Sequence, residues 1–277
     1  MPTIIARASE SAHWYTRTGL PQYTVKAKDG SDRATTLRDA RKFELLPSVT
    51  TVMKVAAMPA LEAWKQEQML LAALTLPRVE GETEKQLIER IVHDSKETGR
   101  KAADRGTEMH EAIEKWLGGK KPDKHESIAV AYENRIYEHF ELPKYPSDIA
   151  RVMTWQIERS FSHELGYGGK CDAYVSPSTV AKTGIVLDTK TKEFAAGDKV
   201  PAYEEQLMQL AAYRHGLGMP KARCANVFVS ALPECAGLIH IHEWTEEELQ
   251  RGFEMFKCLL SYWQLKNQFN IPSEKRI

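Results

Sequence analysis

Two short segments with alternating side chains, residues 169–175 and 185–190, constrain the fold of this chain most strongly. Successive side chains of a β-strand point to opposite faces, so Asp188 and Lys190 share one face of the second segment. In the first segment, Asp172 lies on a polar face and the opposite face is apolar. Turn-forming serine, proline and glycine residues separate the two segments. We therefore expect two adjacent antiparallel strands that bring the two aspartates close together.

The polar residues of this expected hairpin indicate a divalent metal site. Two neighbouring carboxylates repel each other unless a cation lies between them, and oxygen ligands suit Mg²⁺ or Mn²⁺. An ion held by Asp172 and Asp188 would lower the pKa of a bound water. Lys190 could hold the attacking water and offset charge that grows on a phosphate. For the Asp-x-Lys tripeptide alone, an exposed ion pair on a solvated strand is the alternative.

Two residues earlier in the chain are candidate metal ligands. His110 borders the apolar stripe of a helix expected over residues 100–118, so its side chain should point inward. A hydrogen-bonded core histidine is the alternative. Glu158 lies on a strand-like segment before the first aspartate, where it could add a carboxylate or be solvated.

A helical segment that follows the Lys190 strand carries two further polar candidates. Gln209 and Tyr213 are four residues apart and therefore share a helix face. Polar groups on an otherwise apolar helix indicate contact with a buried site or a phosphate. A hydrogen bond between the helix and the sheet would give the same pattern.

The order of these residues, His, Asp, Asp-x-Lys and Gln-x-x-x-Tyr, resembles the RecB-like branch of the PD-(D/E)xK nuclease superfamily. The match runs from about residue 100 to residue 245. The resemblance implies that the metal ligands are His110, Asp172, Asp188 and the main-chain carbonyl of Thr189. It also implies that Lys190 is the catalytic lysine, and that Gln209 and Tyr213 brace the lysine and the scissile phosphate. Cys171 replaces the proline of the superfamily pattern, a position that varies within this branch.

The same resemblance implies an α/β fold with a PD-(D/E)xK restriction-endonuclease-like core, in which helices flank a mixed central β-sheet. We expect an N-terminal strand region and helical extension over residues 1–100, and the nuclease core over residues 101–277. Residues 46–53 and 59–64 look like the start of phage-encoded RecB-like exonucleases and are similar to the mitochondrial genome maintenance exonuclease. The two helices expected between residues 59 and 100 could cover the cleft.

Hydrophobic periodicity predicts the elements of the core. A buried strand should follow the helix that carries Gln209 and lie parallel to the Lys190 strand, because a helix connects them. A closing helix should complete the fold. The expected strands are 152–162, 168–176, 184–191, 223–229 and 238–244, and the expected helices are 202–217 and 246–268.

Composition sets limits on partners and cofactors. Lysine plus arginine equals aspartate plus glutamate at 38 each, so any positive path for nucleic acid must be local. The candidates are Lys120, Lys121, Lys124, Lys182, Lys190, Lys192 and Lys199. Iron–sulfur relatives use one early cysteine and a C-terminal group of three, whereas the first 170 residues here contain no cysteine, so we predict no iron–sulfur cluster. No apolar run reaches membrane-spanning length, so we expect no membrane partner and a cytoplasmic location, in the host if the chain is phage-encoded.

These observations predict a Mg²⁺- or Mn²⁺-dependent DNA exonuclease that acts on single strands or free ends in phage or bacterial recombination, replication or repair. A recombination protein or a single-strand-binding protein would be a fitting protein partner. One alternative is an endonuclease of the same fold that cuts branched or double-stranded DNA. The other is a nucleic-acid-binding module without catalysis, against which the intact Asp172, Asp188 and Lys190 argue.

Overall fold

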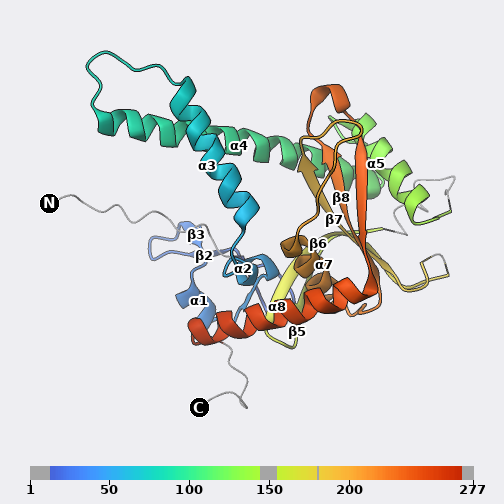
Figure 1. Cartoon of the computed structure of the whole chain (residues 1–277). Helices are drawn as coiled ribbons and strands as arrows, with labels where there is room; N and C mark the ends of the chain where they lie inside the picture. Colours follow the sequence, from blue (N-terminus) through green and yellow to red (C-terminus); the bar gives the residue numbers. More distant parts are fainter. Residues whose placement is uncertain (1–12, 144–154, 180, 270–277) are drawn as a thin grey trace.

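A five-stranded mixed sheet forms the centre of the computed structural model, which describes residues 13–143, 155–179 and 181–269 (Figure 1). The strands lie in the order β5-β6-β7-β8-β9. Their bounds are Gln156–His163 for β5, Tyr167–Val175 for β6, Ile185–Lys192 for β7, Arg223–Ser230 for β8 and Ile239–Trp244 for β9. The expected mixed sheet with flanking helices is therefore present. Residues 152–154 of the first expected strand lie outside the described residues.

The strand directions agree with the predicted topology. Strands β5, β6 and β7 pair antiparallel in succession, β8 pairs parallel with β7, and β9 pairs antiparallel with β8 at the edge. The helix α7 (Glu204–Gly216) makes the crossover from β7 to β8, as a parallel connection requires.

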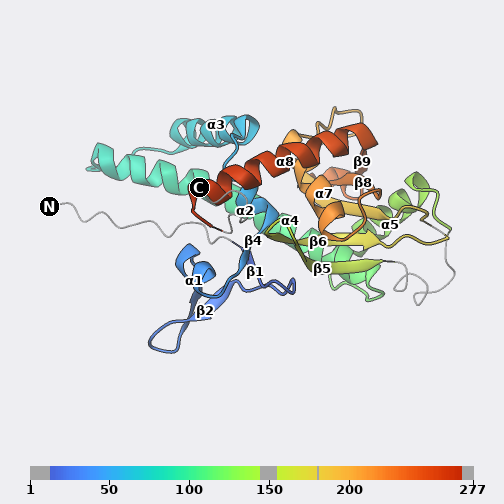
Figure 2. The same ribbon diagram turned by 90° about the horizontal axis from the view of Figure 1, so that it is seen from below.

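Alternation along β7 places its side chains in two cores, one on each face of the sheet. Val186 packs with the helices α2, α7 and α8, whereas Ile185 and Leu187 pack with α4 and α5. Figure 2 shows α8 running along one side of the sheet. The bounds are Val49–Met53 for α2, Glu84–Leu117 for α4, Glu126–His139 for α5 and Glu246–Lys266 for α8.

Helix α4 corrects one expectation. The histidine-bearing helix begins at Glu84, not near residue 100, and runs 34 residues to Leu117. Thr83 caps its start in a capping box, in which the Thr83 hydroxyl accepts a hydrogen bond from the Gln86 main-chain N–H. The helix continues through an internal glycine, Gly99, because one glycine costs only about 1 kcal/mol in a helix. The expected boundary at residue 100 therefore falls inside a continuous helix.

Helix α3 (Pro59–Thr75) packs on the first half of α4 to form a helical hairpin. Figure 1 shows this hairpin projecting away from the body that contains the sheet. Most of the exposed large apolar side chains of the described chain lie on it, among them Leu70 and Leu74.

The N-terminal region forms two small two-stranded sheets, of which the one made by β1 and β4 contacts β6 of the central sheet. Trp14 and Tyr15 are buried, and the Tyr15 and Tyr23 hydroxyls form a hydrogen bond of 2.7 Å, so these aromatic side chains pack within the protein. The turn at Asp29 and Gly30 joins a hairpin, and Gly30 there has a φ of 84°, which favours glycine. The elements are β1 (Trp14–Tyr15), β2 (Thr24–Lys26), β3 (Asp32–Ala34), α1 (Leu37–Lys42) and β4 (Leu46–Pro47).

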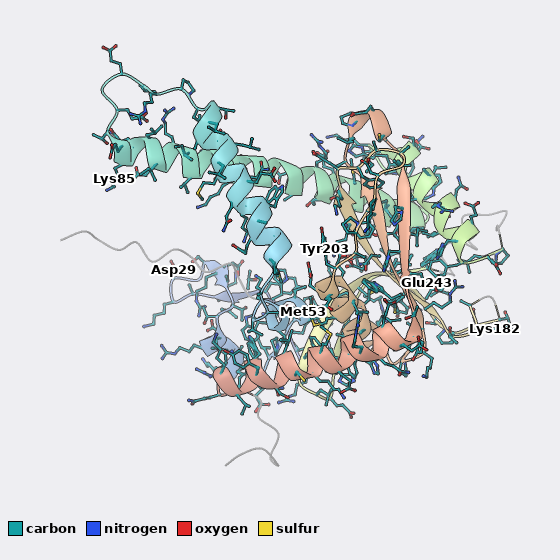
Figure 3. All side chains as sticks on the ribbon, in the orientation of Figure 1. Asp29, Met53, Lys85, Lys182, Tyr203 and Glu243 are labelled. Atoms are coloured by element: carbon teal, nitrogen blue, oxygen red, sulfur yellow. The ribbon has the colours of Figure 1, made fainter. Side chains whose placement is uncertain are left out.

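The far edge of the sheet is fixed by one carboxylate, Glu243 on β9, which Figure 3 labels. It accepts two hydrogen bonds from Arg223 at 2.7 and 2.8 Å, and one from the His139 ring of α5 at 2.8 Å. A short 3₁₀ helix (Pro233–Cys235) joins β8 to β9. Among the described residues, no helix is both long and apolar enough to cross a membrane.

Candidate functional site

The two aspartates lie where the pairing of strands β6 and β7 ends. The ladder between these strands consists of three pairs and ends at Ala173 and Leu187. Extending that register by one residue places Asp172 opposite Asp188. Both aspartates therefore lie one residue beyond the last pair of the β6–β7 ladder.

Asp188 is almost fully buried and is held by two donors. The Lys190 ammonium donates to its Oδ1 at 2.8 Å, and the Asn226 side-chain amide donates to its Oδ2 at 2.7 Å. Burial acts to lower the pKa of Lys190, but the Asp188 and Asp172 carboxylates outweigh it and raise that pKa. Lys190 is therefore a cation at neutral pH. It lies on β7, the same strand as Asp188.

Asp172 is half-buried, and the pKa of its carboxyl is raised. Its Oδ2 accepts a hydrogen bond of 2.9 Å from the Thr189 main-chain N–H. Burial, followed by the nearby Asp188 charge, raises the pKa of Asp172 to about 7. The two carboxylates thus hold more negative charge than Lys190 alone compensates. Such a pair favours an additional cation, and oxygen donors suit a hard divalent ion.

His110 and Asp172 line one small cavity, of about 10 Å³, between α4 and the sheet. That volume is close to what one water or ion needs. Burial lowers the pKa of His110, which keeps the imidazole neutral, as metal coordination requires. The cavity is lined by His110, Ile113, Glu114, Leu117, Tyr132, Ile157, Asp172, Ala173 and Thr189.

Glu114 is a carboxylate of this cavity that the sequence reading did not include. It lies one helical turn after His110, and burial raises its pKa. Its charge also acts to raise the pKa of Asp172. The spacing of four residues from His110 puts both side chains on one helix face, which is a signal that could have identified it.

The candidate ligands do not yet converge on one point. Within the ranges that the structure describes, no group of three or more histidine, cysteine, aspartate or glutamate side chains is arranged to hold a metal ion. The reason lies in the present contacts of Asp188, whose oxygens face Lys190 and Asn226. An ion that used Asp188 Oδ1 would compete with the lysine. The donor set of two carboxylates and one neutral imidazole nevertheless fits Mn²⁺ or Mg²⁺ chemically.

Helix α7 brings its polar face to the lysine. Gln209 Oε1 accepts from Lys190 Nζ at 3.4 Å, and Gln209 Nε2 donates to the Tyr213 hydroxyl at 3.0 Å. The spacing of four residues predicted a shared face, and the structure places Gln209 next to the lysine and Tyr213 next to Gln209. Their contact with a phosphate stays a prediction.

Glu158 lies next to the site but is engaged elsewhere. The β5–β6 register puts it opposite Asp172, yet its carboxylate forms an ion pair with Lys170. Its φ of 54° is left-handed, which is uncommon outside glycine, and it falls between the paired residues Ile157 and Arg159. Its role as a metal ligand stays a prediction, and any such role would require release from Lys170.

Sequence reasoning also missed two residues that fix the site from other elements. Asn226 on β8 is fully buried and contacts Asp188, as described above. The Tyr132 hydroxyl of α5 forms a buried hydrogen bond of 2.8 Å with Thr189 Oγ1. Thr189 is therefore held at its main-chain N–H by Asp172 and at its side chain by Tyr132.

Comparison with known proteins adds little to this geometry. No protein-family model matches the chain, and no curated protein matches it. A solved structure titled "Crystal structure of SSO0001" is similar at 14% sequence identity, with a TM-score of 0.30, over 78% of this chain and 90% of that one. A similarity at this level carries no argument about function.

Proposed function

We propose that this chain is a metal-dependent deoxyribonuclease with a PD-(D/E)xK core. The observation that carries the proposal is the end of the β6–β7 ladder, where Asp172 and Asp188 each lie one residue beyond the last pair and Lys190 Nζ lies 2.8 Å from Asp188 Oδ1. Two carboxylates offer oxygen ligands for a divalent ion, and the ammonium hydrogen-bonded to one of them can stabilise the negative charge of a phosphate at the same place.

The residues that would hold Mg²⁺ or Mn²⁺ are Asp172, Asp188, His110 and the Thr189 main-chain carbonyl. When bound, such an ion polarises a phosphoryl oxygen and lowers the pKa of a bound water. The raised pKa of Asp172 and the neutral imidazole of His110 support this assignment, because both favour a bound cation over the present arrangement.

The chain itself supplies the positioning of the reacting groups. Lys190 combines a cationic ammonium with a side chain that is 33% exposed, so a phosphate in solvent can reach it. In the proposal it holds the attacking water and offsets the negative charge that develops on the phosphate. Gln209 limits the position of that ammonium, and Tyr213 in turn holds the Gln209 amide.

Local lysines supply the contacts to DNA in this proposal, since the chain has no net charge. Two of the expected candidate lysines already form ion pairs. Lys121 pairs with Glu126 at 3.1 Å, and Lys124 pairs with Glu108 at 3.3 Å. Lys192 follows Lys190 by two residues on β7 and lies 5.2 Å above the Tyr203 ring, which Figure 3 labels at the start of α7. We assign the phosphate contacts nearest the site to Lys190 and Lys192.

Action at DNA ends is the further part of the proposal. The α3–α4 hairpin leaves the body at α2 and returns along α4, so a strand could be threaded beside it (Figure 1). Its projection away from the sheet also fits an open site, which is the arrangement that an endonuclease needs. Incubation of a linear and a closed circular single strand of the same sequence separates the two. Loss of only the linear strand supports the exonuclease, and rapid cutting of the circle supports the endonuclease.

Lys190→Ala tests the catalytic assignment. Cleavage of an end-labelled strand should require Mg²⁺ or Mn²⁺, stop with a chelator, and slow by roughly a hundredfold to a thousandfold in this variant, the scale for losing one transition-state stabiliser. The matched control is Lys28→Ala, an exposed lysine in the turn between β2 and β3, which should cleave at the wild-type rate. Undiminished cleavage by Lys190→Ala would refute the assignment.

A further inference from the structure

The aspartate of the Asp-x-Lys segment has a buried neighbour on the next strand. The parallel register pairs Asp188 with Asn226, and both side chains are almost completely buried. Asn226 Nδ2 donates to Asp188 Oδ2 at 2.7 Å. Asn226 is the polar interruption of an apolar strand, flanked by the buried Ala225 and Val227, and a polar side chain in such a position needs partners for both ends of its amide.

The second partner fixes which way the amide points. Trp244 on β9 donates its indole N–H to Asn226 Oδ1 at 2.7 Å. An indole nitrogen is a donor only, so the amide oxygen must face Trp244 and the amide NH₂ must face Asp188. Rotating the amide by half a turn would place two donors together on one side and two acceptors on the other. The network therefore has one satisfied arrangement.

This arrangement sets the orientation of the Asp188 carboxylate. With Oδ2 held by Asn226, the other oxygen is turned toward Lys190 and the junction of the strands. Rotation of the carboxylate would leave a buried donor on Asn226 without its acceptor, which is unfavourable. The indole thus acts on the site through two hydrogen bonds without touching the junction.

We propose that Asn226, locked by Trp244, is a positioning residue that holds Asp188 with one oxygen presented to the site. The role in metal binding rests on the proposed nuclease function, whereas the orientation of Asp188 does not. The network lies on the side of Asp188 away from Asp172, so it restricts the aspartate without occupying the space where a ligand would bind.

Two variants test the proposal in the full chain. Trp244→Phe keeps the ring but removes the donor, and Asn226→Leu removes both ends of the amide. The matched control is Ser230→Ala on the same strand, which removes a buried hydrogen bond of 2.7 Å to the Phe194 carbonyl. Calorimetry with Mn²⁺ should show binding weakened about tenfold to a hundredfold in the two variants, the scale for a partner of a metal ligand, and unchanged in the control.

Each outcome decides one assignment. Cleavage by Trp244→Phe should recover toward the wild-type rate as the Mn²⁺ concentration is raised, because the variant holds Asp188 less firmly in position. A purely structural role of Trp244 would instead lower the melting temperature and leave the Mn²⁺ dependence of cleavage unchanged. Wild-type Mn²⁺ affinity in both variants overturns the positioning role. If the wild-type chain binds no Mn²⁺, the nuclease assignment fails. Metal-free crystal structures then decide the positioning role, which an unmoved Asp188 carboxylate in Asn226→Leu would overturn.

Discussion

Replacing Asp172 by asparagine should stabilise the metal-free protein, and the gain should depend on pH. Asparagine keeps a carbonyl oxygen that can accept the hydrogen bond from Thr189, but it has no charge to bury beside Asp188. The folded protein raises the pKa of Asp172 from 3.8 to about 7. The carboxyl is therefore protonated in the folded state at low pH and charged, at a cost, at high pH.

The magnitude follows from that difference. About three pKa units correspond to about 4 kcal/mol at 1.4 kcal/mol per unit, and solvent near the half-buried carboxylate reduces this to roughly 2 kcal/mol. The sign is set by linkage, because a folded-state pKa above the unfolded value removes stability as pH rises from about 4 to about 7. Asp172→Asn should thus gain most above pH 7 and little at pH 4. In a chain of this size, 2 kcal/mol corresponds to about 4–8 °C in melting temperature.

Thermal melts of both proteins in a chelating buffer at pH 4.5 and pH 8 provide the assay. The control is Asp29→Asn in the exposed turn between β2 and β3, where hydrogen bonds from Ser31 lower the pKa of the carboxyl, so this variant should show no gain at pH 8. A melting temperature of Asp172→Asn that exceeds the wild type equally at both pH values, or falls below it at pH 8, would show that the Asp172 charge does not destabilise the folded protein. The variant should also lose cleavage, since it removes a proposed ligand.

Further substitutions on α4 test its packing against β7 and the role of His110. A Cβ atom at Gly106 would lie 2.6 Å from Thr191 Oγ1, so Gly106→Val should push the helix off β7, destabilise the protein by about 1–3 kcal/mol and slow cleavage. Gly99→Ala on the same helix meets its nearest atom at 3.4 Å, so melting and cleavage should stay near wild type. His110→Ala should raise the Mn²⁺ concentration for half-maximal cleavage about tenfold or more with little change in melting temperature; a large loss of melting temperature with normal Mn²⁺ dependence would make it a core histidine.

The parts of the site that follow from local sequence patterns were predictable. Alternation identified β6 and β7, which pair antiparallel, and Asp172 and Asp188 each lie one residue beyond the last pair of that ladder. Helical spacing likewise placed Gln209 and Tyr213 on one face, where Gln209 contacts the lysine and Tyr213 contacts Gln209. In each case the residues that meet are close in sequence or joined by one turn or one helix, so the period of the element fixes their relation.

The remaining contacts depend on which elements become neighbours in the folded chain. Tyr132 reaches Thr189 across 57 positions, and Trp244 reaches Asn226 from a different strand. No local pattern encodes such pairs, although a single asparagine inside an apolar strand does signal that a buried partner exists. The length of α4 was missed for a different reason, since its cap at Thr83 lies far from the histidine and the helix passes through Gly99 without breaking.

The proposed nuclease activity depends on a divalent ion held by Asp172 and Asp188 beside Lys190. Anomalous X-ray scattering from crystals soaked in Mn²⁺ tests it most directly, at an Mn²⁺ concentration that supports cleavage. We expect a peak about 2 Å from carboxylate oxygens of both aspartates, and no peak there in Asp172→Asn. A wild-type protein that cleaves DNA with no ion between these aspartates, or with its ion bound elsewhere, would contradict it.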